Sequence, residues 1–128
     1  MNKLPALAVV LSFAAVSTAA AHHSAAATYA AHEAVAVKGR VAGFAWTNPH
    51  CHVYIDVASG AFAGRTYTVE LGSPSALSAD GWTKTTLRPG DHVVMTVHPS
   101  RAGTASGLCR RCAVTLNGAP WRSSGTVE

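Results

Sequence analysis

Charged residues are scarce in this sequence, and its basic side chains are scattered. Only 12 % of the 128 residues are charged, and the ten lysines and arginines form no run longer than two. A nucleic-acid-binding surface needs clustered positive charge with interleaved aromatic rings. We therefore expect no nucleic-acid partner.

Sequence motifs of the common enzyme classes are also missing. The chain contains no GxSxG, no HExxH and no P-loop glycine pattern, and its six acidic residues offer no credible pair for acid–base catalysis. We therefore predict no catalytic residues, and the sequence favours a binding protein over an enzyme.

Cysteine is limited to Cys51, Cys109 and Cys112. In an oxidising compartment, an odd number leaves at least one free thiol or an intermolecular bond. Cys109 and Cys112 have the CxxC spacing of redox and metal sites, but we expect them in a strand. Residues i and i+3 of a strand lie about 10 Å apart, beyond the roughly 7 Å limit for a disulfide. A packing role is therefore favoured over redox or metal chemistry.

A long apolar run occurs only near the N-terminus. Lys3 precedes the almost uninterrupted apolar residues 4–16, and the small residues 17–21 suit a signal peptidase site. A transmembrane helix needs about 20 apolar residues, so a membrane anchor is the less favoured alternative. We predict that residues 1–21 are a cleavable signal peptide and that the mature protein is periplasmic, without a membrane anchor.

The remaining chain is dominated by strand-like alternation of apolar and polar residues. Five segments show it: residues 35–46, 51–58, 65–71, 92–98 and 108–116. Between the third and fourth lies one short helix, residues 73–80, with Ser73 as cap, Pro74 at its first position and Gly81 at its end. This order predicts an all-β domain, a five-stranded OB-like Greek-key barrel; a small β-sandwich is the alternative.

The domain boundaries follow from the same patterns. Residues 22–34 are rich in alanine and show no strand pattern, so we expect a flexible or loosely docked N-terminal arm. Residues 35–121 form the predicted barrel domain. Residues 122–128 are polar, and we expect a frayed tail.

Several strings together resemble a family of small exported proteobacterial proteins of unknown function. They are AHHS at 21–24, WTNPH at 46–50, ELGSP at 70–74, GWT at 81–83 and LRPGD at 87–91. The similarity covers almost the whole mature chain in the same order. It implies an exported β-domain and no particular activity. The three cysteines depart from the family's pattern.

Histidines are the most suggestive candidate ligands. Cleavage after Ala21 makes His22 the N-terminal residue, whose α-amine and imidazole can chelate one metal ion together. A further imidazole completes a nitrogen-rich set that suits Cu(II). The arrangement resembles the histidine brace of lytic polysaccharide monooxygenases and periplasmic copper carriers, from which only the N-terminal histidine carries over. Cleavage after Ala20 instead gives Ala21-His22-His23, a tripeptide that binds Cu(II) or Ni(II) without needing a fold.

A second pair of histidines, His50 and His52, follows the turn at Asn48 and Pro49. Both side chains are expected on the outward face of their strand, where residues i and i+2 lie about 7 Å apart and can converge on one ion. His50 is the first choice to meet the arm. Equally, Asn48 and His50 can serve only to hold the turn together by hydrogen bonds.

The sequence therefore supports two hypotheses for function. The first is an exported metal-binding protein, a carrier, buffer or sensor, with copper as cofactor and nickel or zinc as alternatives; its ligands are His22, His23, His50 and His52. The second is a metal-free periplasmic module that binds a ligand or protein through Trp46, Tyr54 and Trp82. Asn48 and the outward Glu70 at the rim are further binding candidates.

Overall fold

The computed structural model describes residues 25–121, which form seven strands, one helical turn at residues 25–28 and a short helix, α2. Their bounds are β1 Val35–Ala45, β2 His52–Val57, β3 Thr66–Glu70, α2 Pro74–Ala79, β4 His92–Pro99, β5 Ser106–Leu108, β6 Val114–Leu116 and β7 Ala119–Trp121. The predicted signal peptide, His22, His23 and the predicted tail lie outside the described residues.

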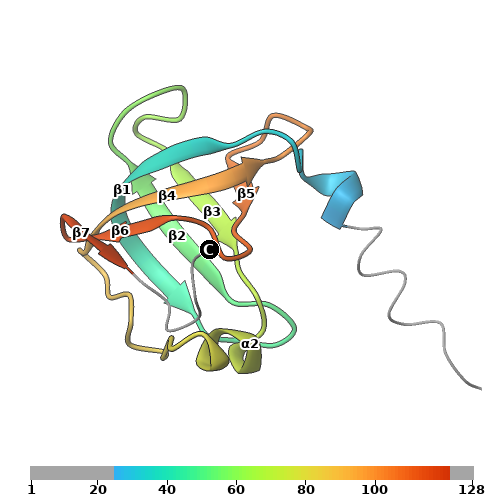
Figure 1. Cartoon of the computed structure of the whole chain (residues 1–128). Helices are drawn as coiled ribbons and strands as arrows, with labels where there is room; N and C mark the ends of the chain where they lie inside the picture. Colours follow the sequence, from blue (N-terminus) through green and yellow to red (C-terminus); the bar gives the residue numbers. More distant parts are fainter. Residues whose placement is uncertain (1–24, 122–128) are drawn as a thin grey trace, which may run out of the picture.

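The first five strands close into a small barrel (Figure 1). The order is β1-β2-β3-β5-β4, and β1 also pairs with β4 to complete the circle. All of these pairings are antiparallel except that of β3 with β5. A closed barrel of five strands, most of them paired antiparallel, confirms the predicted all-β class and the predicted barrel. The alternative, a small sandwich, is not what the structure shows.

Strand β1 bends, and its two halves pair with different strands. Residues 35–40 pair with β4, and residues 39–45 pair with β2, with a register shift between Val41 and Gly43. A β-bulge of this kind increases the local twist. At Gly39 the backbone of β2 lies so close that a Cβ atom would collide with the Asp56 carbonyl oxygen. Glycine at position 39 therefore lets the two strands meet at the bend.

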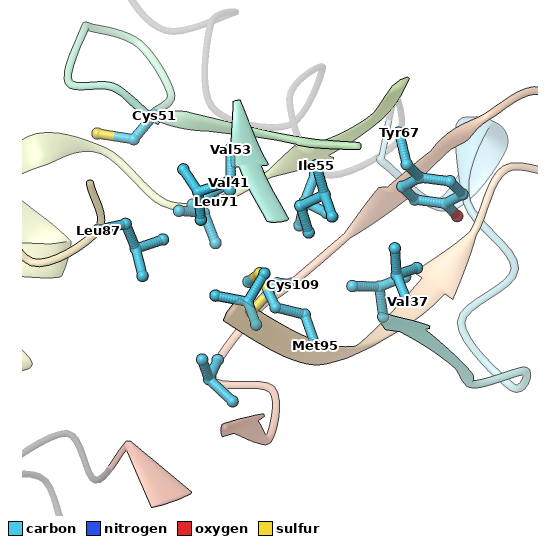
Figure 2. Close-up of a cluster of buried hydrophobic side chains, with 14 of the residues drawn as sticks. Val37, Val41, Cys51, Val53, Ile55, Tyr67, Leu71, Leu87, Met95 and Cys109 are labelled. Atoms are coloured by element: carbon cyan, nitrogen blue, oxygen red, sulfur yellow. The ribbon is translucent and has the colours of Figure 1, made fainter. Parts of the chain in front are cut away.

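The barrel interior is filled by the residues whose alternation predicted the strands. Figure 2 shows Val53, Ile55 and Tyr67 on one side, facing Met95 and Val37 on the other. The residues expected on the inward faces are all buried: Cys51, Val53, Ile55, Val57, Tyr67, Val69, Leu71, Val93, Met95 and Val97. The period-two pattern thus correctly predicted which residues of β2, β3 and β4 form the core.

The short helix also forms as predicted. The Ser73 hydroxyl accepts a hydrogen bond of 3.2 Å from the Ala76 amide, and Pro74 begins the helix. These are a standard N-cap and a residue preorganised for the first turn. Leu77 is buried, so α2 packs against one end of the barrel (Figure 1).

The predicted fifth strand, residues 108–116, is wrong in its continuity. The structure has two three-residue strands, β5 and β6, which both pair with β4. Between them, residues 109–113 lie opposite only two residues of β4, Thr96 and Val97. The extra residues form a turn in which Arg111 has a positive φ of 54°.

Cys109 and Cys112 form a disulfide across this turn, which overturns the expectation that their spacing forbids one. That expectation assumed an extended strand. Because the chain turns after β5, the two Cα atoms lie only 5.1 Å apart, inside the range that a disulfide needs.

The strand β7 was missed, although the sequence contains its signal. Asn117 and Gly118 have φ values of 49° and 82° and join β6 to β7. An Asn-Gly pair is the strongest short-range indicator of a tight hairpin because both positions of the turn need positive φ.

The segment before β1 is attached to the barrel. Residues 25–28 are helical, Tyr29 forms a β-bridge with Ser100, and the Ala30 amide donates a hydrogen bond of 2.9 Å to the Pro99 carbonyl. Tyr29 and Ala30 are both buried. Across residues 25–121, no helix is both long enough and apolar enough to cross a membrane.

Candidate functional site

The carboxylate of Glu70, at the end of β3, joins two distant parts of the chain. Its Oε2 accepts a hydrogen bond of 2.9 Å from the Tyr29 hydroxyl. Its Oε1 lies 3.2 Å from Nδ1 of His50. The His50 and Glu70 side chains are 34 % and 20 % exposed, so both remain accessible to a ligand from solvent.

The pairing of β2 with β3 places these groups together. His52 lies directly opposite Glu70, and directly opposed residues of an antiparallel pair project to the same face. Beyond the strand ends, the Cys51 amide donates to the Gly72 carbonyl and the Leu71 amide donates to the Cys51 carbonyl. These bonds continue the ladder and hold the backbone next to His50.

Between the two histidines, Cys51 points the other way, into the barrel. Its thiol is completely buried, and burial raises the pKa of this thiol above its ordinary value. A thiol of raised pKa is a poor nucleophile and a poor metal ligand at neutral pH. Cys51 therefore belongs to the core rather than to the site on the outer face.

The environment of Tyr29 keeps its hydroxyl protonated. Burial, followed by the hydrogen bond to Glu70 and the negative charge of that carboxylate, raises the pKa of Tyr29 to about 12. At neutral pH the phenol is thus a hydrogen-bond donor to Glu70. The contact fastens the N-terminal segment beside His50.

Of the candidate residues, His50, His52 and Glu70 lie together at the ends of β2 and β3, whereas the aromatic residues form no shared exposed surface. Trp82 is only 6 % exposed, and its ring packs edge-on against Phe44 and Trp121. Trp46 packs against Phe44, with ring centroids 5.7 Å apart. Tyr54 alone among the three is well exposed, at 37 %.

The turn before His50 carries Asn48 on the surface. Asn48 is exposed, and the Asn48–Pro49 peptide bond is cis. The Thr47 hydroxyl donates a hydrogen bond of 3.3 Å to the His50 carbonyl. The backbone of the turn is thus held by Thr47, while the His50 side chain is held by Glu70.

Tyr29 is the site residue that the sequence did not indicate. Its partner lies 41 positions away, and no periodic pattern links the two. The available signal was weak: Tyr29 is the one tyrosine, tryptophan or phenylalanine in residues 22–34.

No complete metal site is present among residues 25–121, because no three His, Cys, Asp or Glu side chains there are arranged to hold one ion. The other three histidines in this range have other environments: His32 is exposed in the segment before β1. Nδ1 of His98 lies 2.7 Å from the Glu33 carbonyl oxygen, and His92 is exposed beside the Asn117 turn.

The fold and this site define a small closed β-barrel with a Tyr–Glu–His chain on its outer surface. The chain belongs to DUF6152, a family of unknown function whose model matches residues 9–111. This agrees with the resemblance to an uncharacterised family. Comparison with curated proteins gave no match, and comparison with solved structures gave none either.

Proposed function

We propose that this is an exported copper-binding protein whose processed N-terminus supplies part of the ligand set. His22 and His23 come from that terminus, and His50 comes from the barrel, with His52 beside it. The observation that carries the proposal is the chain of contacts from Tyr29 to Glu70 to His50. It fastens the N-terminal segment to the carboxylate that also holds the candidate barrel ligand.

The short distance along the chain supports the same meeting point. Seven positions separate His22 from Tyr29, and the last four before Tyr29 are helical. With a rise of about 1.5 Å per helical residue and at most about 3.6 Å per extended one, the terminus stays within roughly 17 Å of Tyr29. His50 is linked to the Tyr29 side chain through one carboxylate.

The orientation of His50 suits a metal ligand. Because its Nδ1 faces Glu70, its Nε2 is the nitrogen left for an ion. Histidines that bind metals commonly donate their other N–H to a carboxylate, which fixes the ring and raises its basicity. The α-amine and imidazole of His22 would add two nitrogens, and such nitrogen-rich ligation ranks Cu(II) first, ahead of Ni(II) and Zn(II).

The experiment compares protein carrying its native processed terminus, with the cut confirmed by mass, and protein carrying an extra N-terminal methionine. Copper at a hundredfold excess over Kd should stabilise the first by about 2.7 kcal/mol, with a nitrogen-rich paramagnetic resonance signal. The second should lack both. Equal affinity in the two forms would exclude the terminus as a ligand.

The variants His50→Ala and His52→Ala then separate two modes of binding. Weaker binding in His50→Ala indicates a site shared between terminus and barrel. Unchanged binding in both indicates that the terminal tripeptide suffices. If the native protein binds no metal at all, the metal-free module becomes the better hypothesis, and its surface is that around Trp46 and Tyr54. A carrier, a buffer and a sensor would all bind copper in this way.

A further inference from the structure

The disulfide between Cys109 and Cys112 lies in the turn that follows β5, and its two sulfurs differ in accessibility. Cys109 is 4 % exposed, whereas Cys112 is half-buried. Arg110 and Arg111 lie between them and are both exposed. The third cysteine, Cys51, is a separate buried thiol.

A cavity of about 350 Å³ opens beside this disulfide, and both cysteines line it. Most of the other lining residues come from α2 and the adjoining barrel end, and many are apolar, including Leu71, Leu77, Ala79, Trp82 and Trp121. At its edge, Nε of Arg111 lies 3.6 Å from a carboxylate oxygen of Asp80. The cavity is therefore an apolar recess with a disulfide in its wall.

A purely structural role explains this bond poorly. In the chain-entropy model, a disulfide stabilises a fold more as the loop it closes becomes longer. Here the bond joins residues only three apart, so the constraint on the unfolded chain is close to the smallest possible. Positive side chains beside a CxxC pair also favour the thiolate form, which is the reactive one.

We propose that Cys109–Cys112 is a thiol–disulfide exchange site that oxidises dithiols in extended polypeptides, with an apolar side chain of the substrate seated in the adjacent cavity. A substrate thiolate attacks Sγ of Cys112, the more accessible sulfur. The Cys109–Cys112 bond breaks, and Cys109 leaves as a thiolate that takes a proton from water. The second substrate thiolate then attacks the substrate sulfur of the mixed disulfide, and Cys112 leaves as a thiolate.

The reaction balances as a two-electron exchange. The two substrate thiols become one disulfide, and the protein disulfide becomes two thiols. A small-molecule disulfide, such as oxidised glutathione, restores the starting state by the same chemistry in reverse. The charge of Arg110, next to Cys109 in the chain, favours the thiolate that leaves, whereas Asp80 partly offsets the charge of Arg111.

The test uses oxidised protein with Cys51→Ala, which removes the unrelated thiol, in the presence of a metal chelator. The probe is a reduced synthetic peptide with two cysteines flanked by leucine and tryptophan. We expect peptide disulfide to form in a one-to-one ratio with loss of the protein disulfide, followed by mass after alkylation. The rate should be at least tenfold higher than with an equal concentration of oxidised glutathione.

Two matched substitutions on α2 test the cavity. Ala79 lines it and Ser78 does not, although both are exposed. Ala79→Gln should slow the exchange several-fold, and Ser78→Gln should leave it unchanged. Equal rates in the two variants, or oxidation no faster than by glutathione, would overturn the proposal.

A trapping experiment tests the order of attack. The probe here is the peptide with a single cysteine, activated as a mixed disulfide with thionitrobenzoate. The Cys112 thiolate of Cys109→Ser should attack the peptide sulfur and release thionitrobenzoate, at least tenfold faster than the buried Cys109 thiolate of Cys112→Ser does. Trapping at equal rates would contradict the assigned order. Circular dichroism checks that both variants fold. If either does not, the proposal is judged on the peptide-oxidation rates of the protein with both cysteines, of Ala79→Gln and of Ser78→Gln.

Discussion

The hydroxyl of Tyr29 and the carboxylate of Glu70 are hydrogen-bonded at 2.9 Å, although 41 positions separate them in the chain. The bond connects the segment before β1 to the end of β3, where His50 contacts the other carboxylate oxygen. One acidic side chain thus contacts both the segment before β1 and the ring of His50. The consequences for stability and for the proposed copper binding can be measured separately.

Removing the hydroxyl of Tyr29 should loosen this attachment. Tyr29→Phe keeps the buried ring and deletes one hydrogen bond to a carboxylate, so we expect the free energy of unfolding to fall by about 1–2 kcal/mol. Urea denaturation measures the change. Tyr54→Phe is the matched control: its side chain is exposed on β2, and we expect a change below about 0.5 kcal/mol. Equal losses in the two variants would contradict the anchoring role.

The same tyrosine predicts a loss of stability in alkali. Its pKa is raised from 10.0 to about 12 in the folded protein, mainly by burial and then by Glu70. A group whose folded pKa is raised stabilises the fold fully below the unfolded pKa, and this contribution is lost as the pH rises through the folded pKa. Stability should therefore decline between pH 10 and pH 12.

Comparison with Tyr29→Phe isolates this contribution, because burial also raises the pKa of Tyr67 in both proteins. Urea midpoints measured from pH 8 to pH 12 should converge for the original protein and the variant as the pH rises. A gap that stays constant over this range would show that Tyr29 ionises normally in the fold.

The bend of β1 predicts a contrast between two glycines of one strand. A Cβ atom at position 39 would collide with the Asp56 carbonyl oxygen, whereas one at position 43 would meet only Cδ2 of Tyr54 at 3.5 Å. Gly39→Ala should therefore destabilise the barrel by roughly 2 kcal/mol or more. Gly43→Ala should change stability by less than about 1 kcal/mol. Thermal unfolding of both variants checks this, and a similar loss in both would argue against the close approach at Gly39.

The sequence predicted most of the barrel because its strands obey a simple period. Apolar residues at every second position of β2, β3 and β4 all face the core. The failure at residues 109–113 has an equally physical cause. The chain turns there through a positive φ at Arg111 and without glycine or proline. Because those two residues are the usual sequence signals of a turn, nothing in the sequence marked the end of the strand.

The candidate site was predictable only in its local part. His50, His52 and Glu70 lie on strands whose pairing follows from the hairpin, and their shared face could be inferred. Tyr29 could not, because its position depends on how the N-terminal segment docks against Pro99 and Ser100. Such docking arises from tertiary contacts that leave no periodic signal.

The role of Glu70 in orienting His50 gives a prediction for copper affinity. Glu70→Gln keeps an oxygen that can accept from Tyr29 but removes the negative charge beside Nδ1 of His50. Loss of such a supporting carboxylate typically weakens metal binding by about 10–100-fold. We therefore expect the copper Kd of protein with its native terminus to rise by at least tenfold, measured by competition with a chelator of known affinity.

Glu33→Gln is the matched control for this measurement. It removes the same charge from the N-terminal segment, but Glu33 contacts His98 through its backbone carbonyl rather than its side chain. Its copper affinity should stay within about twofold of the original, because a solvent-exposed charge has a weak effect at physiological ionic strength. Equal weakening in both variants would mean that overall negative charge, rather than the orientation of His50, governs binding. An unchanged Kd in Glu70→Gln would show that His50 is not a ligand of the proposed copper site. The terminal residues would then be the remaining candidate ligands.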